Sequence, residues 1–349
     1  MKRIIGLDIY RLLAMVLITN IHYFGYSKVI TNPDLLPFNK YFILINTSFT
    51  SCFVDMFVLL TGYLLGRKIC KKMRLVDLWF QTFIVGVIML IACGICSPSS
   101  LSLKTIAHTI FPITTFTYWY LIPYGMLFIL IPFINKLMDG TERRKLQQFI
   151  MVWGGVFLII EVNPIMSLDW FIGNYMSIVW FAYIYVIGAY IARYGFPFNN
   201  IIWSVLGIAS ATLMIAIKVI GIHCPMEMRL TSFCSPLPLI VSLSLFLLLS
   251  KVNSLGKRTD ALLSSLSASS LCIYLVQEQT SFRQLFWPAI IINDFAGLPY
   301  LILHWVVTVS TIFFISWIAY KLYLLLYGKF LSPRVVTLIV EKMKKHINK

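Results

Sequence analysis

The feature that most constrains this chain is a recurring apolar run of about twenty residues, the length that a helix needs to cross roughly 30 Å of hydrocarbon. Strands of a membrane barrel would instead be about ten residues long and would alternate in polarity, which these runs do not. The sequence therefore predicts an all-α, polytopic membrane protein, a bundle of about ten transmembrane helices. We place the spans at residues 4–26, 41–65, 76–96, 118–138, 149–162, 176–194, 201–222, 233–250, 262–286 and 298–327.

Composition agrees with a lipid environment. The 349 residues are 59% hydrophobic and 12% charged, whereas about a quarter of the residues in a soluble domain are charged. The net charge of +16 could indicate nucleic acid binding, but the lysines and arginines are dispersed among the segments between spans. A nucleic acid surface needs a contiguous basic patch, so we expect the lipid bilayer as partner and no nucleic acid.

The positions of the basic residues predict how the chain is oriented. Counted from a cytoplasmic N-terminus, the inner segments hold 22 lysines and arginines and the outer segments hold six, with Arg11 inside a span. This excess on the inner side predicts that both the N-terminus and the C-terminus are cytoplasmic. No segment between spans exceeds about twenty residues, so we expect one domain over 1–349, with helices from about 4 to 327 and a basic cytoplasmic tail at 328–349.

The first span carries ionisable residues, which are costly in a bilayer and therefore indicate function by default. Eleven helical steps from Arg11 to His22 turn through about three revolutions, so both side chains share one face about 16 Å apart. Two structural alternatives remain: Arg11 could snorkel to the inner surface with Asp8, and His22 could be a satisfied core histidine.

Two further polar positions lie within predicted spans. Asp55 needs a cation or several donors, and Arg11 is the nearest candidate in chain order; a structural pair and a catalytic role are equally open. In the ninth span, Tyr274 precedes the polar run of Gln277, Glu278 and Gln279, which must face a cavity or the outer boundary rather than lipid.

Aromatic and basic clusters lie at the predicted membrane boundaries. Tyr118 and Trp119 begin the fourth span and are typical of an interfacial aromatic belt, although they could also contact substrate. The inner segment with Arg67, Lys68 and Lys71 suits anionic lipid heads or a phosphate-rich cytoplasmic ligand. We expect no metal site, because the cysteines lie mostly in apolar spans, where they pack as small residues.

Four motifs in order resemble the membrane-bound acyltransferase family 3, most closely its bacterial branch that O-acetylates surface polysaccharides. They are the spacing of Arg11 and His22, FVDMFVLLTGYLL at 53–65, YWYLIPYGMLFILIPFIN at 118–135, and IYLVQE at 273–278. The resemblance implies a multi-pass enzyme of the bacterial inner (plasma) membrane that moves acetyl from cytoplasmic acetyl-CoA to a hydroxyl of a cell-surface glycan or its lipid-linked precursor. It also implies that Arg11 and His22 are the functional pair.

The chain departs from this pattern at one position. Many relatives have a histidine where this sequence has Gln277, while the adjacent acid is present as Glu278. An amide cannot act as a base, so a second proton relay at this position is in doubt, although Gln277 could still orient a substrate hydroxyl.

Acetyl transfer needs a base or a nucleophilic carrier, and His22 suits either role, with Glu278 as a further catalytic candidate. Arg11 cannot release its proton, so we expect it to hold the pyrophosphate of acetyl-CoA or an acid partner. Arg67, Lys68 and Lys71 could bind the ribose phosphate end, and Asp55, Tyr118, Trp119, Tyr274 and Gln277 are the candidate substrate contacts. The alternative function is a transporter or flippase of a lipid-linked sugar, with the buried charges along its path.

Overall fold

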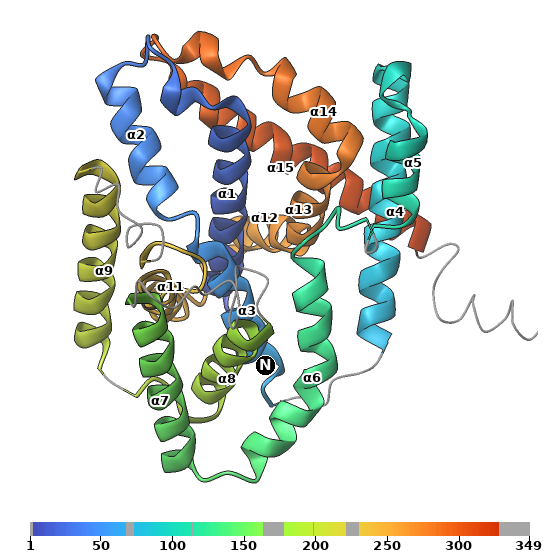
Figure 1. The fold of residues 1–349 in the computed structure, drawn as a ribbon. Coiled ribbons are helices and arrows are strands. Elements are labelled where there is room, and N and C mark those ends of the chain that lie inside the picture. Colours follow the sequence, from blue (N-terminus) through green and yellow to red (C-terminus); the bar gives the residue numbers. More distant parts are fainter. Residues whose placement is uncertain are drawn as a thin grey trace, which may run out of the picture.

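A computed structural model describes residues 3–67, 73–112, 115–162, 178–197, 199–220 and 230–327. Every regular element in these ranges is a helix, which confirms the all-α prediction (Figure 1). The α-helices are α1 (Ile5–Ser27), α2 (Pro37–Ser48), α3 (Cys52–Leu65), α4 (Met73–Cys96), α5 (Leu103–Ile110), α6 (Leu121–Asp139), α7 (Arg143–Val162), α8 (Ile178–Tyr194), α9 (Asn200–Ile220), α11 (Pro236–Leu249), α12 (Lys257–Ala268), α13 (Ser270–Glu278), α14 (Thr280–Ala289) and α15 (Leu301–Leu326). Three short 3₁₀ turns are η1 (Val29–Thr31), η2 (Pro98–Ser100) and η4 (Ile292–Phe295).

Length and apolarity identify a multi-pass membrane protein. Within the described residues, six helical segments are long and apolar enough to span a bilayer, or seven if the bent pair of α12 and α13 counts as one span. Length and apolarity in the described residues therefore identify fewer spans than the predicted number of about ten. The helices α8 and α11 have only 17 and 14 residues, and α7 begins with three basic residues, Arg143, Arg144 and Lys145.

The prediction of one continuous span at 262–286 is wrong. The chain bends by 43° between α12 and α13, and it breaks again at Gln279, which has extended backbone angles. The side chain of Gln279 accepts a hydrogen bond from the backbone N–H of Phe282 at 2.8 Å and so caps the start of α14. The polar run at the end of α13 is therefore the place where the helix stops.

Helix α1 runs through the middle of the molecule, between α9 at one edge and α4 at the other (Figure 1). Beside it, α3 and α8 approach closely at two glycines. A Cβ atom at Gly62 would lie 2.3 Å from the carbonyl oxygen of Tyr185, and one at Gly188 would lie 2.3 Å from that of Leu59. Small residues at such crossings allow the backbones of membrane helices to touch.

Three segments predicted to be cytoplasmic meet at one end of the bundle. Arg67 donates a hydrogen bond to the carbonyl oxygen of Arg193, and Arg193 pairs with Asp139 at 2.7 Å. Their proximity agrees with a common side for these segments. The orientation of both termini relative to the membrane stays a prediction.

Candidate active site

The predicted polar face of α1 is present in the structure. Arg11, Met15, Ile18 and His22 are three or four residues apart, and they line two cavities that lie along the helix. The first cavity, of about 460 Å³, contains Arg11. The second, of about 370 Å³, contains His22.

His22 contacts the predicted acid of α13. Its Nε2 lies 3.0 Å from Oε1 of Glu278, and both side chains are buried. The other carboxylate oxygen, Oε2, lies 3.5 Å from Nη1 of Arg283, which is 41% exposed. A carboxylate in contact with the imidazole orients the ring.

The second imidazole nitrogen of His22 is uncommitted. Nδ1 is buried and has no hydrogen-bond partner in the structure. Because a carboxylate only accepts hydrogen bonds, the contact with Glu278 assigns the hydrogen of neutral His22 to Nε2. The lone pair is then on Nδ1, which is the state that a general base requires.

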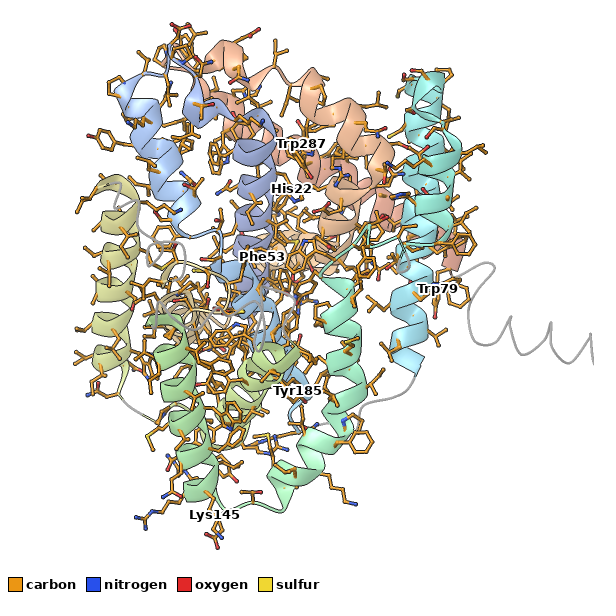
Figure 2. All side chains as sticks on the ribbon, viewed as in Figure 1. His22, Phe53, Trp79, Lys145, Tyr185 and Trp287 are labelled. Atoms are coloured by element: carbon orange, nitrogen blue, oxygen red, sulfur yellow. The ribbon has the colours of Figure 1, made fainter. Side chains whose placement is uncertain are left out.

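Aromatic rings surround this pair. The ring of His22 contacts those of Tyr26 and Trp287, with centroids 5.5 and 5.9 Å apart. Arg283 lies over the Tyr26 ring at 5.9 Å. Figure 2 shows Trp287, His22 and Phe53 in that order along the centre of the bundle, far from Lys145 at the opposite end.

Arg11 lines the first cavity, and only part of its hydrogen-bonding capacity is used by neighbouring side chains. Its Nη1 donates to Oγ of Ser267 at 2.9 Å and lies 3.7 Å from Asp8. Asp8 is instead held bidentately by Arg3, at 2.7 and 3.0 Å. Since Arg3 already satisfies Asp8, the guanidinium of Arg11 can bind a further anion. Asp77 also lines this cavity, and its Oδ1 accepts a hydrogen bond from Tyr327 at 2.9 Å.

The predicted partnership of Asp55 with Arg11 is wrong. Asp55 is fully buried, and its Oδ1 accepts a hydrogen bond from Nε1 of Trp180 on α8 at 3.0 Å. The close packing of α3 on α8 brings Trp180 to this carboxylate. Asp55 lines neither cavity, so its predicted contact with substrate has no support in this geometry.

The aromatic stretch before α6 does not form an interfacial belt at Tyr118, which is 3% exposed. Tyr118 packs on Tyr274 with ring centroids 6.0 Å apart, while Trp119 lines the second cavity. Tyr274 lines both cavities. Tyr118 is buried because α13 packs against this stretch, where the hydroxyl of Tyr274 also accepts a hydrogen bond from the backbone N–H of Tyr120.

Gln277 is fully buried in α13. Its Nε2 donates to the carbonyl oxygen of Ile273 in the preceding turn at 3.0 Å, and it is not among the residues that line the two cavities. The NH2 group is thus bonded within its own helix, while the amide oxygen Oε1 is buried without a hydrogen-bond partner. A contact of Gln277 with substrate stays a prediction.

The basic segment is only partly described. Arg67 is exposed and lies two residues after Leu65, which lines the first cavity. Lys68 and Lys71 lie outside the described residues. The binding of a phosphate-rich ligand to these three residues stays a prediction.

Sequence reasoning did not assign a role to several residues that complete the site. Arg283 contacts Glu278, Tyr26 and Trp287 surround His22, and Ser267 bonds Arg11. Only the spacing of Arg283 gave a signal: it follows Glu278 by five residues. Arg283 contacts Glu278 across the break at Gln279. A prediction of one continuous helix therefore does not bring these two side chains together.

The fold and these two cavities define a multi-pass membrane protein with an ionisable site inside its helix bundle. A family model described as an acyltransferase domain, that of acyltransferase family 3, matches residues 4–321. The chain belongs to this family and is a membrane acyltransferase. No curated protein and no solved structure matches the chain.

Proposed function

We propose that this protein transfers an acetyl group from cytoplasmic acetyl-CoA to a hydroxyl of a cell-surface glycan, or of its lipid-linked precursor, in a bacterial inner membrane. One observation carries the proposal: α1 presents Arg11 to one cavity and the His22–Glu278 pair to the adjoining one. A cation and a base held at separate places on one helix suit a donor with a charged end and a distant reacting end.

The first cavity is the proposed donor site. By the predicted topology its lining from Asp77, Leu78 and Leu65 lies in the inner half of the membrane. Arg11 would hold phosphate oxygens of CoA, and Arg67, Lys68 and Lys71 would hold the ribose phosphate at the inner mouth. The thin arm of CoA would then extend along α1 toward His22, about 16 Å away.

The second cavity is the proposed site of acyl transfer. The acceptor hydroxyl loses its proton to Nδ1 of His22 as its oxygen attacks the thioester carbonyl carbon. When the tetrahedral intermediate collapses, the carbon–sulfur bond breaks, and the CoA thiolate takes the proton from His22. Glu278 keeps the imidazole oriented and stabilises its protonated form between these two transfers.

Comparing surface glycans tests this proposal most broadly. Mass spectrometry of glycans from strains with and without the gene should show an acetyl group that the deletion removes. This group adds a mass of about 42 Da to the glycan. A complementing copy with His22→Gln should not restore it. Unchanged glycan masses in the deletion strain would contradict the proposed acceptor class.

A further inference from the structure

Three residues line both cavities: Ile18 on α1, Phe53 on α3 and Tyr274 on α13. They come from three different helices and are 3%, 2% and 4% exposed. We call them the constriction, because they form the boundary that the two cavities share.

The side chains of the constriction are held in place. The hydroxyl of Tyr274 accepts a hydrogen bond from the backbone N–H of Tyr120 at 3.2 Å. Phe53 packs edge-on against Trp119 and Phe233, with ring centroids 6.2 and 5.5 Å apart. Because a densely packed aromatic group yields little, this shared boundary is rigid.

We infer that Ile18, Phe53 and Tyr274 form a filter that selects the donor's acyl group by its width rather than by its length. The inference rests on the proposed function, in which the thioester end of an acyl-CoA reaches His22 from the first cavity. It adds the residues that set donor specificity.

The shape of the donor gives the physical reason. A straight acyl chain is no wider than the arm that carries it, so acetyl and butyryl groups enter end-on. A methyl branch next to the carbonyl widens the group beside the thioester, and rigid aromatic walls resist that extra volume. One misplaced methyl group in an apolar site typically changes the rate by about 10- to 200-fold.

The test compares two isomeric donors, butyryl-CoA and isobutyryl-CoA, which differ in shape and not in atoms. Membranes that contain the acceptor and the full-length protein are supplied with each donor, and the release of CoA thiol is measured relative to membranes with His22→Gln. We expect the wild type to use butyryl-CoA at least about tenfold faster than isobutyryl-CoA. Phe53→Leu and Ile18→Ala should each move this ratio toward isobutyryl-CoA by about tenfold.

Phe57→Leu is the matched control, because Phe57 lies one turn after Phe53 on α3 and lines the first cavity but not the second. It should keep the wild-type ratio. Equal rates for the two isomers in the wild type, or equal shifts in Phe53→Leu and Phe57→Leu, would overturn the filter. If Phe53→Leu fails to accumulate, an unchanged ratio in Ile18→Ala overturns it. Failure of wild-type membranes to release CoA even from acetyl-CoA would instead contradict the proposed function.

Discussion

At the scale of single residues, Arg11 and His22 share a helix face but differ in what restrains them. His22 is fixed by Glu278, which leaves one imidazole nitrogen for chemistry. Arg11 has a short hydrogen bond to Ser267 only, since Arg3 takes the short contacts to Asp8. One residue is therefore held for proton transfer, and the other keeps donors for a ligand.

Replacing Arg11 tests this division. Arg11→Lys keeps the charge but loses the planar fork that can bind phosphate bidentately, so we expect most activity to be lost while the protein still inserts into the membrane. The control is Arg144→Lys, which makes the same exchange at an exposed position on α7 and should keep activity. Initial rates at varied acetyl-CoA measure both; full activity of Arg11→Lys would make Arg11 a membrane anchor.

The two buried acids should behave differently. Glu278→Gln removes the charge that stabilises protonated His22, and we expect the transfer rate to fall by about a hundredfold. Asp55→Asn preserves an acceptor for Trp180 and changes no cavity lining, so its rate should stay close to that of the wild type. The same loss in both variants would assign Glu278 to structure rather than to catalysis.

Helical periodicity predicts the pairing of Arg11 and His22 on one face, because both lie within one continuous helix. It cannot predict the partner of Asp55, since Trp180 is 125 residues away and reaches it only through the packing of α3 on α8. The burial of Tyr118 escapes prediction for the same reason. A run of aromatic residues has the same sequence pattern at a membrane interface and in a protein core.

At the scale of elements, the breaks in the ninth predicted span position the site. A straight helix over 262–286 would carry Glu278 and Arg283 away from each other, because five steps turn through about 500° and rise about 7.5 Å. The break at Gln279 lets Arg283 return to Glu278. Hydropathy alone cannot reveal this break, because a polar run inside an apolar segment is equally typical of a continuous helix that faces a cavity.

The crossing of α3 and α8 should be sensitive to a single methyl group. Gly62→Ala would place Cβ against a backbone oxygen, so we expect a loss of stability of about 1–3 kcal/mol. Gly155→Ala on α7, where a Cβ meets no atom within 4 Å, should instead be neutral or stabilising by up to about 1 kcal/mol. Thermal unfolding in detergent measures the difference; equal midpoints would mean that the helices separate without cost.

At the scale of the whole molecule, the distribution of charge predicts the orientation of the bundle, in which two cavities lie along α1. The sequence predicts the membrane class from the repeated apolar runs. Within the described residues, six or seven segments have the length and apolarity of a full span, and the number of about ten stays a prediction. The single-domain organisation stays a prediction.

Orientation can be tested directly. A reporter that is active only in the cytoplasm should work when fused after Lys72, Arg144, Lys257 or Lys349, and fail after Lys104 or Asp294. This result would place the first cavity on the side of cytoplasmic acetyl-CoA. A reporter inactive at Lys349 would reverse the assignment of the C-terminus and the even number of spans.

The most direct test of the account is transfer of labelled acetyl from acetyl-CoA to glycan in membranes that contain wild-type protein or His22→Gln at equal abundance. Glutamine keeps a hydrogen bond to Glu278 but has no lone pair that can accept a proton in catalysis. The account predicts a rate lower by about a hundred- to ten-thousandfold. A His22→Gln protein that retains more than about a tenth of the wild-type rate would contradict the role of His22 as the base.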